Sequence, residues 1–213
     1  MSCRVYLVRH GETVWNANMR FQGHADIALT QSGREQAEAL SKRLSGKTFH
    51  AVYSSDLIRA YETAVILAEP HGLQVHKRPN LREINFGKWE GLTYKEIIDQ
   101  FGESARKWWD NPSITRIPGG EKLTEVAERC YRALKLIVED HQGQELLLVA
   151  HGGTIRCLVS SVLGIDLNQY WRLRLDNTAL NIIEFPEWGK GILVLYNDTN
   201  HLVGGSGDTF SDR

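Results

Sequence analysis

Long apolar runs, abundant cysteine and a recognisable leader are all missing from this chain of 213 residues. No stretch approaches the ~20 apolar residues that a membrane-spanning helix needs, and the first residues lack the pattern of a signal peptide. The three cysteines, Cys3, Cys130 and Cys157, are odd in number and widely spaced, which argues against a disulfide framework or a thiolate zinc site. These absences predict a cytoplasmic protein without a membrane partner.

A strong charge of either sign is also missing. The chain has 25 Lys and Arg against 26 Asp and Glu, so no overall positive field would attract nucleic acid. Three motifs are absent as well: the GxxxxGK[ST] phosphate loop, GxGxxG after a strand, and the GxSxG nucleophile elbow. Their absence argues against the nucleotide-binding and hydrolase classes that they mark, although a local group of arginines could still bind a small anion.

The apolar residues that are present form short runs alternating with helical patterns. The runs predict strands at 4–8, 51–54, 145–150, 179–185 and 191–196, the last two as a hairpin. Between them, the spacing predicts four helices. Thr30 and Asp56 are expected to cap the first two, the third is expected to begin after Gly119-Gly120, and Thr154 is expected to open the fourth. Alternating strands and helices predict an α/β fold with a mostly parallel central sheet and helices on both faces.

One segment departs from this alternation. Residues 87–120 carry aromatic side chains at helix-like spacing without a strand pattern, so we expect a helical lid there. Its Trp89, Tyr94, Trp108 and Trp109 would either stack on an aromatic part of a ligand or fill the lid's own core. Residues 204–213 are rich in Gly, Ser and Asp and are predicted to be a loose tail, which leaves residues 1–203 as a single domain.

Two of the predicted strands end in the same way. Residues 5–13 read VYLVRHGET and residues 146–154 read LLLVAHGGT. Ligands of parallel α/β sheets bind at the carboxyl ends of the strands, which is where His10 and His151 fall. A glycine after each histidine lets the backbone turn sharply and approach a ligand closely. Taken alone, a histidine after a strand is more often structural than catalytic.

Arginines stand at the same predicted rim. Arg9 precedes His10, and Arg59 lies in the first turn of the helix after strand 51–54. Guanidinium groups bind phosphate through paired N–H donors, whereas their charge would oppose a bound cation. The pattern therefore favours a phosphoryl group over a metal, provided that the fold brings these distant residues together.

Several blocks of the sequence resemble one known family, the histidine phosphatase superfamily, also called phosphoglycerate mutase-like. The blocks are LVRHGETVWNANMRFQGHADIALTQSGREQA at 7–37, YSSDLIRAYETA at 53–64, LREINFGKWEGLT at 81–93, PGGE at 118–121 and LLLVAHGGTIR at 146–156. They span nearly the whole chain in the family's order. The resemblance implies a three-layer α/β/α sandwich and phosphoryl transfer through a phosphohistidine.

The resemblance also implies roles for individual residues. His10 would be the nucleophile, and Glu83 would protonate the leaving oxygen. The phosphoryl oxygens would be held by Arg9, Asn16, Arg59 and His151. Gln22 and Gly23 are expected to border the pocket, and Gly152 to approach the phosphate, although Gln22 could equally be an ordinary polar loop residue. No metal and no cofactor are implied.

The phosphatase and mutase branches of this family differ after Glu83. The chain reads INFGKWEGLT there, which resembles the phosphatase branch. The lid also lacks the mutase branch's basic motif, although it contains Lys88, Lys95, Arg106, Lys107 and Arg116. We therefore expect hydrolysis of a small phosphorylated metabolite, with α-ribazole 5′-phosphate or a sugar phosphate as candidates. Phosphoglycerate mutase activity and a non-catalytic phosphate-recognition module are the alternatives, and the oligomeric state stays open.

Two further arginines, Arg82 and Arg156, lie beside the implied site residues in the sequence. Each would either lend its charge to the pocket or form an ion pair elsewhere.

Overall fold

The computed structural model describes residues 2–202, so the predicted tail at 204–213 lies outside the described residues. The strands are β1 (Cys3–Arg9), β2 (Ala51–Ser54), β3 (Val75–Lys77), β4 (Glu145–Ala150), β5 (Leu180–Phe185) and β6 (Ile192–Asp198). The α-helices are α1 (Val14–Ala17), α2 (Gln31–Leu44), α3 (Ile58–Ala68), α4 (Tyr94–Asp110), α5 (Leu123–Asp140) and α6 (Gly152–Leu163). Short 3₁₀ helices are η1 (Glu69–His71), η2 (Pro79–Leu81), η3 (Gly87–Trp89), η4 (Leu167–Arg172) and η5 (Asn200–Leu202).

The strands form one mixed sheet in the order β3-β2-β4-β1-β5-β6. The first four strands are parallel to one another, and β5 runs antiparallel to both β1 and β6. In the central pair, Arg9 of β1 stands opposite Ala150 of β4. Because this register pairs the last residues of both strands, the residues that follow, His10 and His151, leave the sheet side by side.

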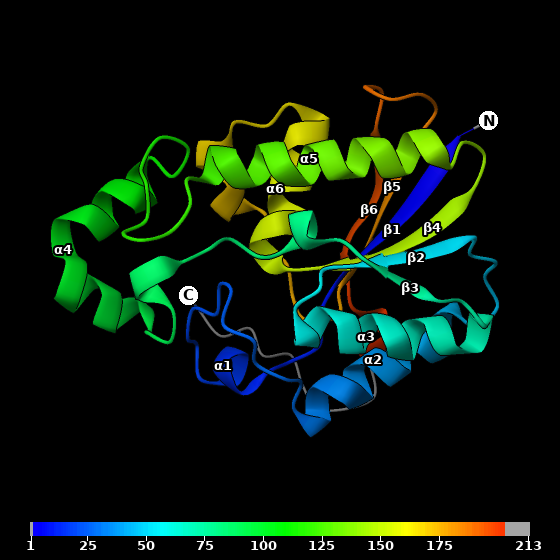
Figure 1. The fold of residues 1–213 in the computed structure, drawn as a ribbon, viewed down its shortest axis with the longest axis horizontal. Helices are drawn as coiled ribbons and strands as arrows, with labels where there is room; N and C mark the ends of the chain where they lie inside the picture. Colours follow the sequence, from blue (N-terminus) through cyan, green and yellow to red (C-terminus); the bar gives the residue numbers. More distant parts are fainter. Residues whose placement is uncertain (1, 203–213) are drawn as a thin grey trace.

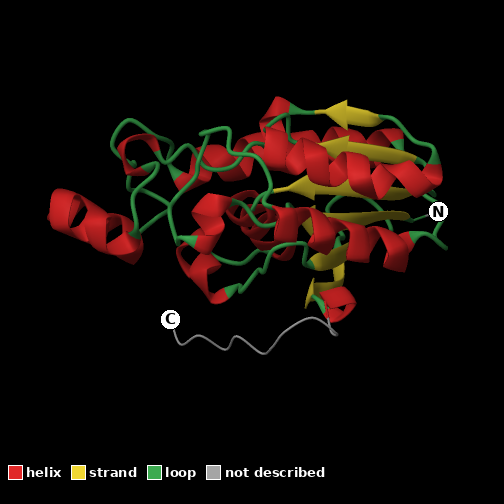
Figure 2. Cartoon of the chain, turned by 90° about the horizontal axis from the view of Figure 1, so that it is seen from below, coloured by secondary structure: helices red, strands yellow, loops and turns green. Residues whose placement is uncertain are grey.

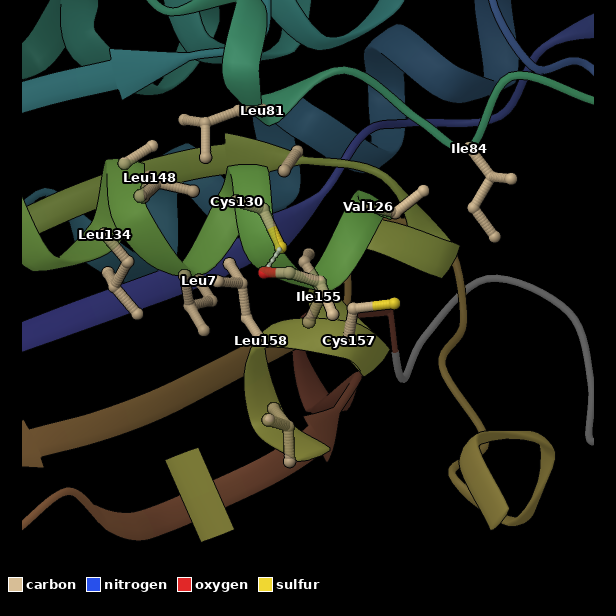
Figure 3. Packing of buried hydrophobic residues seen from close by; sticks show 14 of the residues in the cluster. Leu7, Leu81, Ile84, Val126, Cys130, Leu134, Leu148, Ile155, Cys157 and Leu158 are labelled. Atoms are coloured by element: carbon tan, nitrogen blue, oxygen red, sulfur yellow. Dashed lines mark hydrogen bonds between the residues drawn. The ribbon is translucent and has the colours of Figure 1, made fainter. Parts of the chain in front are cut away.

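Helices cover both faces of the sheet (Figure 1). α2 and α3 pack on one face through an apolar cluster that includes Leu40 and Leu67. α5 and α6 pack on the other face, where residues such as Leu134 and Leu158 meet Leu148 of β4 (Figure 3). The predicted α/β/α sandwich is confirmed, because side chains alternate to opposite faces of each central strand and both faces are buried.

Helix ends show where local patterns predict well and where they fail. Thr30 caps α2 as expected, since its side chain accepts a hydrogen bond from the Gly33 N–H. Asp56 was expected to cap α3, but the N-cap is Leu57 and the Asp56 carboxylate instead binds the guanidinium of Arg82. The prediction that the fourth helix begins at Thr154 was wrong by two residues, since α6 already begins at Gly152.

Segment 87–120 contains η3 and α4, which extend beyond the carboxyl ends of the strands (Figure 2). Trp89 and Trp108 are fully buried, with ring centroids 5.4 Å apart. Trp109 stacks nearly parallel on Trp171 of η4, so aromatic packing attaches this segment to the body. Trp89 and Trp108 therefore fill a core, whereas Tyr94 is 54% exposed.

No helix within residues 2–202 is both long enough and apolar enough to cross a membrane. The cytoplasmic location and the single-domain organisation of residues 1–203 stay predictions.

Candidate active site

The two strand-end histidines meet at the carboxyl edge of the sheet. The ring centroids of His10 and His151 lie 5.2 Å apart, and the side chains are 3% and 0% exposed. The two histidines therefore lie together at this edge, as the strand-end argument predicted, because the β1–β4 register aligns the last residues of both strands.

His10 has a fixed hydrogen-bonding pattern. Its Nδ1 lies 2.7 Å from the carbonyl oxygen of Gly11. A carbonyl only accepts, so Nδ1 carries the hydrogen and Nε2 keeps its lone pair. Burial, followed by the charges of Arg59 and Arg9, holds the pKa of His10 well below its usual range. The imidazole is therefore neutral at pH 7 and has one unprotonated nitrogen.

His151 is the N-cap of α6 but makes no side-chain cap. Neither of its ring nitrogens has a hydrogen-bond partner among residues 2–202, although both are buried. Burial, together with the charges of Arg59 and of His10, lowers the pKa of His151 well below its usual range. A buried polar group without a partner costs stability, so a ligand that bonded to either nitrogen would remove that cost.

Arg59 lies in the first turn of α3 and is completely buried. Its guanidinium donates to the carbonyl oxygens of Gly23 at 2.7 Å and Ala25 at 2.8 Å. Burial lowers its pKa to about 10, and nearby carboxylates, with Glu83 first, act in the opposite direction. Arg59 is still cationic at pH 7, and its charge acts on both histidines.

Arg9 contacts Gly152, at the start of α6, and the loop before β5. Its Nη1 donates to the carbonyl oxygen of Leu175 at 2.6 Å. A Cβ at Gly152 would lie 3.6 Å from Nε of Arg9, so Gly152 sits directly against the guanidinium. The structure thus places Arg9, Arg59, His10 and His151 in one group, as the strand-end argument predicted.

Glu83 meets this group at the N-terminus of α6. Its carboxylate accepts hydrogen bonds from the backbone N–H groups of Ile84, Gly153 and Thr154, at 2.9, 3.1 and 3.2 Å. A Cβ at Gly153 would lie 2.5 Å from the carboxylate. The second glycine of AHGGT therefore makes room for Glu83, which the sequence alone did not indicate.

Asn16 of α1 is linked to the backbone of His10 through the side chain of Asn177. Its Oδ1 accepts from the backbone N–H of Thr13 at 3.1 Å and from Nδ2 of Asn177 at 3.3 Å. These donors fix the orientation of the amide, since only the oxygen accepts. Nδ2 of Asn16 is left as a donor to which no acceptor is assigned within residues 2–202.

Gln22 and Gly23 lie in the loop that supports Arg59. Gln22 is 6% exposed, and its Oε1 lies 2.9 Å from the Thr13 hydroxyl. Gly23 has φ +54°, and a Cβ there would lie 2.0 Å from Oε1 of Glu90. Gly23 thus contributes its carbonyl to Arg59 and cannot be replaced without displacing Glu90.

Arg82 and Arg156 make contacts of their own. Arg82 forms the ion pair with Asp56 described above. Arg156 donates to the carbonyl oxygen of Leu173 and lies over the rings of Tyr170 and Trp171. Of the two readings left open by the sequence, the ion pair holds for Arg82.

Asn177 was not singled out from the sequence. Besides binding Asn16, its Nδ2 donates to the carbonyl oxygen of His10 at 3.0 Å. The next residue, Thr178, is fully buried and has φ +52°, an uncommon conformation for a β-branched residue. The contact between Asn177 and His10 spans 167 positions in the sequence, so local patterns do not predict it. The sequence itself shows just two adjacent polar residues, Asn177 and Thr178, shortly before strand β5.

Residues 5–199 match the family model of the histidine phosphatase superfamily, branch 1. The chain belongs to this superfamily. Phosphoserine phosphatase 1 of Hydrogenobacter thermophilus is 33% identical over 199 residues, covering 93% of this chain and 94% of that protein. A probable phosphoglycerate mutase, GpmB of Yersinia pestis, is 36% identical over 203 residues with the same coverage.

Solved structures agree with the family assignment. Bacillus stearothermophilus YhfR superposes with a TM-score of 0.88 at 33% identity, covering 94% of this chain and 99% of that one. A putative alpha-ribazole-5′-P phosphatase from Escherichia coli gives a TM-score of 0.85 at 29% identity, covering 92% and 99%. Together, the family and these relatives identify the chain as a phosphatase enzyme.

Proposed function

We propose that the chain hydrolyses phosphomonoesters without a metal, through a phosphohistidine on His10. The observation that carries this proposal is the imidazole of His10. Its Nδ1–H is held by the Gly11 carbonyl, and its lone-pair Nε2 lies in a buried site with two cationic guanidinium groups. A neutral, oriented imidazole beside bound positive charge is what attack on an anionic phosphoryl group requires.

The reaction has two steps. In the first, Nε2 of His10 forms a bond to phosphorus while the P–O bond to the leaving group breaks, and Glu83 donates a proton to the leaving oxygen. In the second, water attacks phosphorus and the P–N bond breaks. Glu83 takes a proton from that water, so it ends the cycle as it began. The three backbone N–H donors keep the carboxyl group in place, because either protonation state retains acceptor lone pairs.

Four side chains would bind the phosphoryl oxygens. Arg9 and Arg59 supply positive charge, and Asn16 supplies the amide donor that its neighbours leave unused. His151 supplies a ring N–H that has no partner within residues 2–202. Because the phosphoryl group in flight carries its charge on the equatorial oxygens, fixed donors around it account for most of the catalysis.

Three further residues would border the bound phosphate. Gly152 lies against Arg9, and Gln22 and Gly23 belong to the loop whose carbonyls orient Arg59. We assign Gln22 and Gly23 to the pocket wall and Gly152 to the phosphate edge.

The donor set of the site favours metal-independent chemistry. Within residues 2–202, no group of three or more His, Cys, Asp or Glu side chains is arranged to hold a metal ion. In the proposed site, the arginine charges would oppose a cation directly.

Hydrolysis is favoured over mutase activity by the lid. A mutase must clamp the carboxylate of a sugar acid with basic side chains and exclude water. Lys88, Lys95, Arg106, Lys107 and Arg116 are all exposed. Lys107 pairs with Glu103 and Arg116 with Glu125, so these two charges are already matched outside the buried site.

The substrate class is a small phosphorylated metabolite. A related phosphoserine phosphatase from Entamoeba histolytica was solved with phosphoserine at 28% identity and a TM-score of 0.86. The putative alpha-ribazole-5′-P phosphatase keeps α-ribazole 5′-phosphate as a candidate beside phosphoserine and sugar phosphates. A non-catalytic phosphate-recognition module is disfavoured, because the chain lacks none of the side chains that the proposed reaction needs.

A steady-state screen tests the proposal. The panel contains O-phosphoserine, α-ribazole 5′-phosphate, sugar phosphates and 3-phosphoglycerate, the last with and without 2,3-bisphosphoglycerate. We expect phosphate release that is unchanged by EDTA. Isomerisation of 3-phosphoglycerate without phosphate release would establish the mutase alternative, and activity lost with EDTA and restored by a divalent ion would overturn the metal-independent mechanism.

A further inference from the structure

The loop that carries Glu83 is held by a partly buried ion pair from outside the reaction site. Arg129 of α5 and Glu121, the last residue of the PGGE segment, form this pair at 2.9 Å, and their side chains are only 19% and 21% exposed. Neither residue takes part in the proposed reaction. PGGE is the one block of the sequence resemblance that the proposed reaction does not use.

The guanidinium of Arg129 is directed at the backbone around Glu83. Nη1 donates to the carbonyl oxygens of Asn80 and Arg82, at 2.9 and 2.8 Å. Nη2 donates to the carbonyl oxygen of Glu83 itself at 2.7 Å. Nε and Nη2 also bind the two carboxylate oxygens of Glu121. One side chain therefore binds three carbonyl groups within four residues of the loop.

Glu121 and the glycines before it hold the same loop from the other side. The Glu121 carboxylate accepts from the backbone N–H of Asn85 at 2.8 Å. A Cβ at Gly120 would lie 2.2 Å from the carbonyl oxygen of Asn85, and a Cβ at Gly87 would lie 2.5 Å from that of Pro118. The PGGE segment thus packs against the loop backbone at a distance that only glycine permits.

The electrostatics agree with a tight pair. Burial by itself would lower the pKa of Arg129, but the Glu121 carboxylate outweighs it and raises that pKa above its usual value. Burial would raise the pKa of Glu121, yet hydrogen bonding and charge from Arg129 hold it below its usual value. Both groups are therefore charged across the pH range in which the enzyme would work.

We propose that Arg129 and Glu121 are positioning residues for the general acid: they fix the backbone of Glu83 so that its carboxyl group stays on the N-terminus of α6, at the leaving oxygen. Two other contacts complete this support. The Thr154 hydroxyl donates to the carbonyl oxygen of Arg82, and Nε2 of His24 donates to that of Glu83. The inference rests on the proposed function, because it assumes that Glu83 transfers the proton.

The inference predicts a selective defect. p-Nitrophenolate leaves readily without a proton, whereas an alkoxide does not. Replacing Arg129 by methionine should lower kcat/KM for β-glycerophosphate by ~10- to 100-fold, part of the ~10²–10⁴ that a general acid contributes. The loss on p-nitrophenyl phosphate should stay within ~3-fold, since attack by His10 and binding by the arginines are untouched. Glu121→Gln should show the same selectivity with a smaller loss.

Arg132→Met is the matched control. It removes the same charge from the same helix, but Arg132 is 79% exposed and pairs only with Glu128 within the described part of the chain. We expect unchanged kinetics on both esters. Glu83→Gln is the second control, because it already removes the proton donor. Adding Arg129→Met to it should not change the ratio of kcat/KM for β-glycerophosphate to kcat/KM for p-nitrophenyl phosphate any further.

Equal losses on both esters, or an additive effect in the Glu83→Gln background, would overturn the positioning role. If Arg129→Met does not fold, as circular dichroism would show, Arg129→Lys and Glu121→Gln decide the same question. Failure of the proposed function is distinguishable, because the wild-type protein would then form no acid-labile phosphoenzyme with p-nitrophenyl phosphate, whatever the variants do.

Discussion

The two histidines at the sheet edge come from nearly identical sequence patterns but have different surroundings. After β1 the chain continues as a loop, and the Gly11 carbonyl binds Nδ1 of His10. After β4 the chain enters α6 at once, so His151 has no such carbonyl and both its nitrogens lack partners within residues 2–202. The sequence pattern therefore fixes where both imidazoles lie, and the element that follows fixes their hydrogen bonding. The His10 ring is oriented by a carbonyl and is proposed as the nucleophile, whereas the His151 ring is unpaired within residues 2–202 and is proposed as a donor.

The largest expected effect is that of replacing His10, which tests whether His10 is the nucleophile. His10→Ala removes the only nitrogen proposed to bond to phosphorus, so kcat/KM for p-nitrophenyl phosphate should fall at least ~10³-fold. Rapid-quench labelling with a ³²P-labelled ester should detect no acid-labile adduct. Circular dichroism serves as the control for folding. Turnover near that of the wild type would reject His10 as the nucleophile.

His151→Ala should have the next largest effect. Removing one fixed donor to the phosphoryl oxygens typically costs ~10²–10³ in rate. The phosphoenzyme should still form, more slowly, and map to His10. If the adduct is instead lost from His151→Ala and persists in His10→Ala, the roles of the two histidines are reversed.

The pH dependence of stability tests what the two histidines share. Both have pKa values well below the ordinary 6.5 because they are buried beside cations. The unfolded chain therefore takes up protons at a higher pH than the folded chain, and the free energy of unfolding decreases as the pH falls below 6.5. Each histidine that stays neutral in the folded state lowers the free energy of unfolding by about 1.4 kcal/mol at pH 5.5, compared with a pH well above 6.5.

Thermal unfolding at pH 7.5 and 5.5 measures this loss. The double variant His10→Gln/His151→Gln should lose less stability on acidification than the wild type, because glutamine does not titrate. An identical loss in both proteins would mean that other groups, such as the partly buried His201, dominate the acid response.

The parts of the site that local residue patterns predicted are those fixed by strand ends, whereas Glu83 was indicated only by the family resemblance. His10, His151 and Arg59 follow from which runs form parallel strands, and this needs only local patterns. Glu83 and Arg129 could be placed only by packing. Glu83 binds Gly153 from 70 positions away, and Arg129 reaches the Glu83 carbonyl across 46 positions. Strand β3 was not predicted, because its three residues are half-buried or exposed and give no apolar run.

The smallest expected effect concerns the side chain that ties the His10 strand end to its neighbours. Nδ2 of Asn177 binds both the His10 carbonyl and Oδ1 of Asn16. Asn177→Ala leaves the Asn16 amide less firmly oriented, so kcat/KM should fall by ~3- to 10-fold, the equivalent of one hydrogen bond. Inhibition by vanadate should weaken in parallel, because Asn16 is proposed to donate to the phosphoryl oxygens.

The Asn16→Ala background shows how Asn177 acts. If Asn177 acts by orienting Asn16, Asn177→Ala should lower kcat/KM little further once the Asn16 amide is gone. The coupling free energy between the two substitutions should then nearly equal the effect of Asn177→Ala alone. If the loss is undiminished in that background, Asn177 acts on the His10 carbonyl instead. The contact that matters would then lie on the backbone of His10. The His151 carbonyl oxygen accepts instead from the backbone N–H of Ile155, so the surroundings of the two histidines would differ at the carbonyl oxygen as well as at the ring.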